Sequence, residues 1–409
     1  MLKKFYEYIV FSGLSASLGL LGVVYMTRTI TPEEYGVIGI FLALLYVLPQ
    51  MISFSSTGLV SINKVKLSEK EFILFSRSFF SFGIINFMGI LVFSAISSFF
   101  FQEYKLIFWV LPVLALLQYL SSFHNMELVQ DRLSKRYGVY RLIISALSLS
   151  LTILCISYFD LTWDGRLIAL LFAEMIALMI AYRLSFKTLH KFRFDFNLSD
   201  FKDYVYFGSP LLLALGAGWV LNQADKFILL NFFTLKDVGI YTVAYSIGMI
   251  VNLINQAATN TIVPTVYRHL ENNEGSKIIK KLNIYYSLMI LSISLTIGLC
   301  SYLYVPLLFG EGYSDSPAII LFIALAFGFN GVYRTTGLVL AFYKQNKLQM
   351  YLLYLSAFVN IVFSIALIPI FGMLSPAIAT MFAYMLLAYL SYIYGWRIIK
   401  RKERLCSEY

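Results

Sequence analysis

The sequence predicts an all-α integral membrane protein with twelve transmembrane helices. Of its 409 residues, 59% are hydrophobic and only 13% are charged, whereas about a quarter of the residues of a typical soluble domain are charged. Twelve continuous apolar runs are long enough to cross a hydrocarbon core of about 30 Å as helices. Because these runs do not alternate between apolar and polar residues, they exclude a transmembrane β-barrel.

Six apolar runs lie in each half of the chain. The first six lie near residues 9–27, 37–57, 79–101, 106–123, 142–159 and 167–182. The other six lie near residues 207–231, 239–261, 284–305, 318–340, 351–370 and 374–395. Lys3 and Lys4 precede the first run as in a secretory signal, but no small-residue cleavage site follows, so we expect this run to be the first span.

Basic residues are distributed unevenly over the loops between the runs. Four of the 32 lysines and arginines fall on one side of the membrane, namely Arg28, Lys105, Arg166 and Lys236, and 26 fall on the other. By the positive-inside rule the richer side, which includes both termini, is cytoplasmic. The formal charge of +10 is therefore explained by loops that face an anionic leaflet. Membrane lipids, and not nucleic acid, are the expected partners.

The two halves are predicted to be repeats of one six-helix unit, as in many transporters. The segment Pro32-Glu33-Glu34-Tyr35-Gly36-Val37 matches Leu235-Lys236-Asp237-Val238-Gly239-Ile240 at the corresponding loop of the second half. We expect a first lobe at residues 1–183, a cytoplasmic interfacial linker at 184–206, a second lobe at 207–396 and a basic tail at 397–409. Because six is even, both repeats enter the membrane from the same side, so their pseudo-axis is expected along the membrane normal.

The linker mixes aromatic and charged residues, which is typical of a segment in the membrane interface. Its aromatic residues are Phe192, Phe194, Phe196 and Phe201. Ser199, followed by Asp200 and Asp203, predicts a capped helix that leads into the seventh span. The simpler interpretation of the linker is a tether, and the alternative is a gate.

Only four ionisable residues are expected inside the spans, namely Glu174, Asp225, Lys226 and Arg334. Each costs about 2.5–3.5 kcal/mol at the centre of a span, so each is a candidate for function. Lys226 and Arg334 lie near span ends, and snorkelling to the headgroups is an alternative explanation for both. Glu174 lies mid-span, and its short side chain reaches neither interface, so it needs a partner, a proton or a cavity.

A polar patch is predicted in the outer half of the seventh span. Asn222 and Gln223 lie one turn before Asp225 and Lys226. Adjacent residues on a helix point about 100° apart, so Asp225 and Lys226 are expected to face different neighbours instead of forming a pair.

Enzymatic function is disfavoured. The longest predicted outer loop, residues 306–317, is too short to hold an acceptor and catalytic acids. Phosphate-cradling loops and Ser/His/Asp spacings are absent from the sequence. The cysteines (Cys155, Cys300, Cys406) and histidines (His124, His190, His269) are scattered, so neither a disulfide framework nor a metal or cofactor site is expected.

A string of short motifs runs along nearly the whole chain. It comprises Arg28 with Pro32, Tyr35 and Gly36, then Asp225-Lys226-Phe227-Ile228-Leu229, Gly239-Ile240-Tyr241 with Ala244 and Tyr245, Pro264, Phe309-Gly310 with Tyr313, and Pro369 with Gly372, Ala377, Ala379 and Thr380. In these motifs the chain resembles the polysaccharide transporter family, the O-antigen and repeat-unit flippases of the multidrug/oligosaccharidyl-lipid/polysaccharide exporter superfamily. Ser375-Pro376 departs from the Gly-Ala common in the family, outside the expected cavity.

The resemblance implies two six-helix lobes around a central cavity that opens alternately to either side of a bacterial inner membrane. It implies a flippase that moves undecaprenyl-diphosphate-linked oligosaccharide repeat units to the outer leaflet for O-antigen or capsule synthesis, coupled to H⁺ or Na⁺. Transient contact with other polysaccharide-assembly proteins is also expected. The alternatives are a drug or metabolite exporter of the same superfamily and, from another class, a membrane polymerase or acyltransferase.

Within this framework the ionisable residues acquire specific hypotheses. A diphosphate in a low-dielectric core needs buried cations, so Lys226 and Arg334 are expected to form or border the headgroup site. Asn222 extends that site, and His124 is expected as the first-lobe counterpart of Arg334. Glu174 or Asp225 is expected to bind the coupling ion.

Overall fold

The computed structural model describes residues 2–184, 186–195, 197–271 and 276–407, and no β-strand occurs in these ranges. Twelve candidate membrane spans lie in the described ranges, which confirms the predicted all-α fold and its twelve spans. Some residues named above have side chains outside the described residues, namely Lys3, Lys4, His190, Phe196, Pro264 and Cys406.

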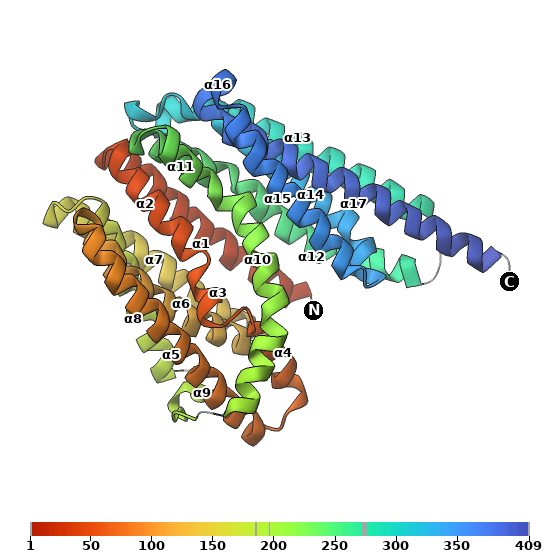
Figure 1. Ribbon diagram of the computed structural model, residues 1–409, viewed down its shortest axis with the longest axis horizontal. Helices are drawn as coiled ribbons and strands as arrows, with labels where there is room; N and C mark the ends of the chain where they lie inside the picture. The colour runs from red at the N-terminus through yellow and green to blue at the C-terminus, as the bar shows by residue number, and fades with distance from the viewer. Residues whose placement is uncertain (1, 185, 196, 272–275, 408–409) are drawn as a thin grey trace. The chain divides into compact units, whose positions relative to one another are not determined.

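The chain divides into two compact units, Met1–Ile30 with Val37–Gly216, and Thr31–Gly36 with Ala217–Tyr409. The first unit contains α1 (Leu2–Thr29), most of α2 (Pro32–Leu45), α3 (Leu48–Ile52), α4 (Thr57–Lys66), α5 (Glu69–Phe100), η1 (Gln102–Tyr104), α6 (Lys105–Gln130), α7 (Ser134–Phe159), α8 (Trp163–Leu184), α9 (Lys187–His190) and the first half of α10 (Leu198–Phe232). Helix α7 packs between α1 and α8, and α6 packs against α5 and α8 (Figure 1).

The second unit is built around α14. It contains the start of α2, the second half of α10, α11 (Leu235–Gly248), α12 (Ile250–Glu271), α13 (Ser276–Leu308), η2 (Glu311–Tyr313), α14 (Ser316–Phe342), α15 (Asn346–Ala366), α16 (Ile368–Phe371), η3 (Gly372–Leu374) and α17 (Ser375–Ser407). Helix α14 packs along α11, α12, α13 and α17, and α17 packs in turn along α15. This central position explains why α14 buries residues along its whole length.

The two matched segments of the repeats begin their helices in the same way. The Thr31 hydroxyl accepts from Glu34 N at 3.3 Å, and the Glu34 carboxylate accepts from Thr31 N at 2.8 Å. Thr234 and Asp237 form the same reciprocal pair at 3.4 and 3.0 Å. These capping boxes satisfy backbone donors at the first turns of α2 and α11, so the two matched segments share one local structure.

The same two segments also pack against each other inside the second unit. A Cβ on Gly36 would lie 2.1 Å from the carbonyl oxygen of Leu235, and a Cβ on Gly239 would lie 1.8 Å from that of Pro32. Because Gly36 corresponds to Gly239 and Pro32 to Leu235 in the repeat, the contact is reciprocal. Only glycine allows the two helix backbones to approach this closely.

The second predicted span, residues 37–57, is not one continuous helix. Helix α2 ends at Leu45, α3 is a separate turn, and Phe54 and Ser55 both have positive φ angles. Helix α10 passes close to this break, since a Cβ on Gly208 would lie 1.9 Å from the carbonyl oxygen of Phe54. The irregular backbone is thus covered by protein, which is the condition for non-helical structure within a membrane.

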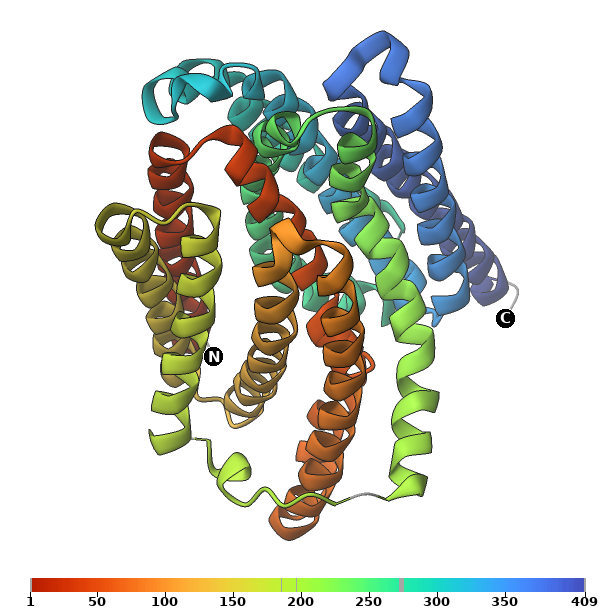
Figure 2. The ribbon, with the colours of Figure 1, turned by 60° about the vertical axis from the view of Figure 1, so that its left-hand side comes forward.

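The connection from α8 to α10 is fastened to the first unit. In Figure 2 it crosses the end of the unit at which α5 begins. Arg77 of α5 donates from Nε to the carbonyl oxygen of Lys191 at 2.8 Å, and Ser81 Oγ accepts from Asp195 N at 2.8 Å. The ring of Phe201 packs edge-on against Phe82. The linker therefore follows α5 closely.

Two details of the linker differ from the prediction. Helix α10 begins at Leu198, and the Asn197 side chain accepts from Ser199 N at 3.1 Å. Asn197, and not Ser199, is thus the capping residue, because an amide oxygen at this position caps equally well. The compact units divide within α10, at Gly216/Ala217, because beyond residue 206 the helix still packs on the first unit, with Phe207 against Gly58 and Gly208 against Phe54.

Candidate functional site

Asp225 lies at the junction of four helices of the second unit and is fully buried. Its Oδ2 accepts a hydrogen bond from Tyr241 Oη of α11 at 2.5 Å and lies 2.8 Å from Thr380 Oγ1 of α17. Asn360 Nδ2 of α15 donates to the same Thr380 hydroxyl at 2.9 Å. Asp225 is therefore held by neighbours on three other helices, which compensates in part for its removal from water.

Three oxygen atoms in this region have no hydrogen-bond partner among the described residues. They are Asp225 Oδ1, Asn360 Oδ1 and the hydroxyl oxygen of Ser364, all buried. Buried polar atoms are normally paired, so unpaired ones need an explanation. A carboxylate, an amide carbonyl and a hydroxyl are ligand types that hard cations prefer, and a proton on Asp225 would satisfy the carboxylate equally.

Lys226 is turned into the protein and is only 3% exposed. Its Nζ donates to Gln223 Oε1 at 2.5 Å and lies 4.7 Å from the ring centroid of Tyr245. The snorkelling alternative is thus not what the structure shows, because the ammonium is buried against an amide and an aromatic ring. Asp225 and Lys226 contact different neighbours, as their angular separation predicts.

Asn222 contacts Tyr245, whose ring lies beside Lys226. Its Oδ1 accepts from Tyr245 Oη at 3.1 Å and from Tyr384 Oη at 3.0 Å, and its Nδ2 donates to the Gly218 carbonyl at 2.6 Å. Tyr245 therefore contacts Asn222 through its hydroxyl and Lys226 through its ring. We call Asn222, Gln223, Asp225, Lys226, Tyr241, Tyr245, Asn360, Thr380 and Tyr384 the second-unit polar cluster.

Arg334 belongs to a separate set of contacts. Its Nε donates to Asn330 Oδ1 at 3.0 Å on α14, and its Nη2 donates to Asn252 Oδ1 at 3.2 Å on α12. Asn330 lies one turn toward the middle of α14, so the guanidinium points away from the nearer helix end. Neither partner is shared with Lys226, and the structure thus leaves the two cations in distinct polar environments.

Glu174 faces a cavity inside the first unit. The cavity has a volume of about 210 Å³ and is lined by Gly22 of α1, Gln118 of α6, Ser148 of α7 and Arg166. Glu174 is 6% exposed. The bundle interior is where an intramembrane carboxyl is expected.

Arg166, expected on the outer side just before the sixth span, lies in the first turn of α8. It donates from Nη1 to Ser148 Oγ at 2.9 Å and to Thr152 Oγ1 at 2.7 Å. Both hydroxyls are on α7, so the side chain points into the bundle, where hydroxyl acceptors replace water. Nothing in the sequence indicated these partners.

His124 is buried on α6 in the first unit. Its ring centroid lies 5.2 Å from that of Tyr140 and 4.8 Å from that of Phe186. It lines a cavity of about 340 Å³ together with Lys64, Glu127 and Arg136. His124 thus belongs to a charged cavity that the sequence analysis did not anticipate.

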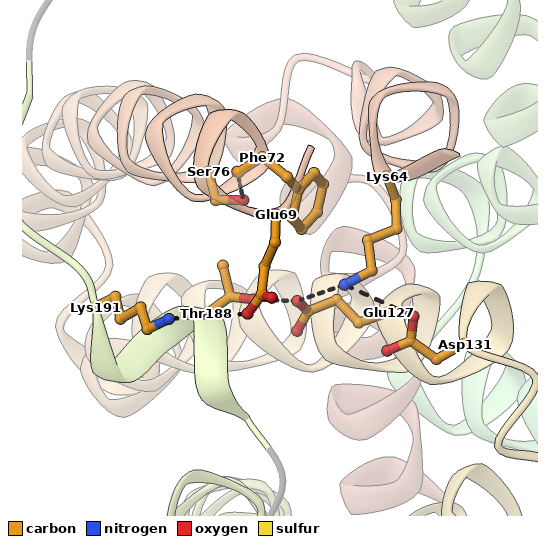
Figure 3. Close-up of polar contacts among 8 residues, drawn as sticks. All are labelled: Lys64, Glu69, Phe72, Ser76, Glu127, Asp131, Thr188 and Lys191. Atoms are coloured by element: carbon orange, nitrogen blue, oxygen red, sulfur yellow. Dashed lines mark hydrogen bonds and ion pairs between the residues drawn. The ribbon is translucent and has the colours of Figure 1, made fainter. Parts of the chain in front are cut away.

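An ion-pair network lines this cavity (Figure 3). Lys64 Nζ lies 3.9 Å from Glu127 Oε1 and 3.7 Å from Asp131 Oδ1. The ammonium also lies 4.7 Å from the ring centroid of Phe72. Thr188 of α9 donates to the Glu127 carboxylate. The network therefore joins α4, α6 and the linker.

Glu127 was missed because the fourth span was expected to end at residue 123, whereas α6 continues to Gln130. Glu127 is 7% exposed, so the first unit buries an ionisable residue beyond those that were predicted. A signal was present: His124, Glu127 and Asp131 are spaced by three and four residues, which places them on one helix face.

Taken together, the fold and these clusters define a multi-pass membrane protein that keeps charged groups inside its spans. Residues 25–318 match the polysaccharide biosynthesis protein family, and the chain belongs to that family. The family and fold place it in the bacterial inner membrane. A curated relative, Lsg locus putative protein 1 of Haemophilus influenzae, is 22% identical over 257 residues, which span 61% of this chain and 62% of the relative.

Two solved structures share the fold. The lipid II flippase MurJ in an inward closed conformation superposes with a TM-score of 0.74 at 14% identity, covering 96% of this chain and 89% of MurJ. A multidrug resistance MATE family transporter of the MOP superfamily superposes with a TM-score of 0.73 at 15% identity, covering 95% and 96%. At these identities the likeness shows the fold and nothing beyond it.

Proposed function

We propose that the protein is a flippase for undecaprenyl-diphosphate-linked oligosaccharides that works by alternating access. The observation that carries this proposal is the buried Lys226 in the second-unit polar cluster of a polysaccharide biosynthesis protein. Placing an ammonium group inside the membrane has a considerable cost in free energy. In a chain of this family, that ammonium group offers a binding partner for a lipid phosphate.

The chemistry around Lys226 suits a sugar diphosphate. The ammonium provides the charge-assisted hydrogen bonds that phosphate oxygens accept. The Asn222 amide and the Tyr245 and Tyr384 hydroxyls provide donors and acceptors for sugar hydroxyls. Arg334 supplies a second cation in the same unit, and we propose that it borders the headgroup site. We propose the same for His124 in the first unit, where it lines a cavity with Lys64 and Arg136.

We propose that Asp225 binds the coupling ion, either H⁺ or Na⁺. In this proposal the unpaired oxygens of Asp225, Asn360 and Ser364 supply the ligands, all within one unit. Because Asp225 is one residue from Lys226, occupation by a cation would change the electrostatic field at the headgroup site directly. Glu174 is the second candidate, since it faces a cavity in the first unit.

We propose that residues 184–206 act as a tether and not as a gate. Arg77 and Ser81 bind the linker backbone, and Thr188 binds Glu127. Several contacts of this kind hold the linker in one position, whereas a gate needs a segment of low local stability.

Transport tests the headgroup site. The full chain would be reconstituted in vesicles with a fluorescent undecaprenyl-diphosphate-linked oligosaccharide, and its outward movement followed with an impermeant quencher. A hydrogen bond to a charged group contributes about 1.5–3 kcal/mol, so Lys226→Ala should slow transport roughly 10- to 100-fold. Lys236→Ala, at an exposed lysine of the same unit, is the matched control.

Two outcomes would count against the proposal. Unchanged transport in both Lys226→Ala and Arg334→Ala, at equal amounts of folded protein, would remove the cation site. If the reconstituted protein takes up cationic drugs but does not move the lipid-linked oligosaccharide, a multidrug exporter is favoured instead. For the coupling ion, transport by Asp225→Asn that still responds to an imposed ion gradient would exclude Asp225, and Glu174→Gln would then be tested in the same way.

A further inference from the structure

A groove in the second unit runs between α13 and α17. Both helices pack along α14 and touch each other little, so the side chains of α14 form the floor of the groove. Its volume is about 360 Å³. The lining is apolar, with Ile284 and Leu288 from α13, Val332 from α14, and Met385, Tyr389 and Tyr392 from α17. Leu288 and Tyr389 are each 61% exposed, so the groove is open along its length.

A pair of lysines lies at one end of the groove. Tyr392 stacks on Trp396, one turn further along α17, with ring centroids 6.4 Å apart and an interplanar angle of 8°. The Nζ atoms of Lys280 and Lys400 each lie 5.8 Å from the ring centroid of Trp396. Trp396 therefore links the apolar groove to two cations that come from different helices. Neither lysine has an acidic partner among the residues that the structure describes.

The depth of these features in the membrane matches one leaflet. Lys280 and Lys400 lie at the ends of the spans Ile278–Leu308 and Ile368–Arg401. From Lys280 to Leu291, the last lining residue of α13, the helix rises roughly 16 Å at 1.5 Å per residue. Half of a hydrocarbon core is about 15 Å thick. With the ends of these spans placed at the membrane interface, the lysines lie at that level and the groove extends to about the middle of the core.

These observations fix the chemistry of an occupant. The groove fits an apolar chain whose length is about the thickness of one leaflet. Lysines at the interface attract an anionic headgroup, and tryptophan is favoured at the same level. By the positive-inside prediction this leaflet is the cytoplasmic one, which carries anionic lipid. A neutral headgroup would offer neither ammonium group a net negative partner.

We propose that the groove between α13 and α17 binds one anionic glycerophospholipid of this leaflet. One acyl chain lies in the groove against Leu288 and Tyr389, and the phosphate contacts Lys280 and Lys400 beside Trp396. The site is independent of the second-unit polar cluster and does not depend on the proposed transport function. Its occupation would join α13 to α17, which otherwise meet mainly through α14.

Tryptophan fluorescence tests the site directly. The chain has four tryptophans, so replacing Trp109, Trp163 and Trp219 by phenylalanine leaves Trp396 as the reporter. The full-length protein would be titrated in mixed micelles with brominated phosphatidylglycerol or brominated phosphatidylcholine, which quench a nearby indole. An attraction of about 1 kcal/mol for each lysine corresponds to roughly fivefold each. Phosphatidylglycerol should therefore bind about 30-fold more tightly than phosphatidylcholine.

Variants separate the headgroup from the chain. In the reporter background, K280Q/K400Q should abolish the preference for phosphatidylglycerol, whereas K66Q/K70Q, at exposed lysines of the first unit, should keep it. Ser287→Phe, which fills the groove at a lining residue, should weaken quenching by both lipids, and Ser287→Ala should not. Elution as a single size-exclusion peak would show that each variant is folded.

Three results would overturn the proposal. The first is equal quenching by both lipids, and the second is a preference that survives K280Q/K400Q. The third concerns the occupant: if undecaprenyl phosphate displaces brominated phosphatidylglycerol far better than unbrominated phosphatidylglycerol does, the groove takes an isoprenoid chain and not a glycerophospholipid.

Discussion

The reciprocal glycine contact between α2 and α11 gives the sharpest test of the structure. In Gly239→Ala the added Cβ would lie 1.8 Å from the Pro32 carbonyl oxygen and 3.0 Å from Gly36 N. Cβ contacts under 3.0 Å are essentially never seen, and the neighbour here is backbone, which has no rotamer to change. The first turns of α2 and α11 must therefore separate, and the capping boxes at Thr31 and Thr234 must move with them.

The size of the effect follows from two opposing terms. Overpacking costs typically about 1–3 kcal/mol and sometimes more, whereas alanine gains about 1 kcal/mol over glycine in helix propensity. The neighbour is backbone and cannot move aside, so the overpacking cost should lie near the upper end of its range. After the gain in helix propensity is subtracted, we expect Gly239→Ala to lower the free energy of unfolding by about 2 kcal/mol. Gly36→Ala, with its Cβ 2.1 Å from the Leu235 carbonyl oxygen, should behave alike.

Equilibrium unfolding in mixed micelles with increasing dodecyl sulfate would measure these changes. Gly89→Ala is the control, since nothing lies within 4 Å of its added Cβ, and it should be neutral or stabilising. The double variant Gly36→Ala/Gly239→Ala should cost less than the sum of the single ones, because the first separation makes room for the second methyl group. A Gly239→Ala protein as stable as Gly89→Ala would refute the close approach.

Three further outcomes follow from individual contacts. Thr234→Ala should lower the free energy of unfolding by about 1 kcal/mol through loss of the α11 cap, whereas Thr234→Ser should not, as the same unfolding titration would show. Thr188→Val removes the donor to the buried Glu127 carboxylate, so trypsin should cut the linker faster in this variant than in Thr188→Ser. Equal rates of cleavage would show that this hydrogen bond does not hold the linker in place. Tyr241→Phe removes one donor to buried Asp225 and should lower the free energy of unfolding by about 1–3 kcal/mol. An unchanged free energy of unfolding would contradict this expectation.

The span pattern and the matched helix caps could be predicted from the sequence because their causes are local. Apolar runs of about twenty residues can satisfy their backbone hydrogen bonds in a membrane only as helices. Thr31-x-x-Glu34 and Thr234-x-x-Asp237 cap helices through residues three positions apart. The different environments of Asp225 and Lys226 follow from helical geometry alone.

The partners of the charged side chains could not be predicted in this way. The sequence placed Arg166 on the outer side just before the sixth span, yet the hydroxyls of Ser148 and Thr152 on α7 draw it into the bundle. Glu127 lies beyond the expected end of its span, and only the folded chain brings Lys64 and Thr188 to it.

The sequence by itself thus determined the all-helical membrane fold, the number of spans and the matched helix caps of the two halves. Only the tertiary structure decided that Lys226 faces Tyr245 and does not snorkel, that Asp225 joins Asn360 and Thr380, and that Lys280 and Lys400 meet at Trp396. The reason is physical. Hydropathy and helical period depend on neighbours along the chain, whereas these contacts join helices far apart in sequence.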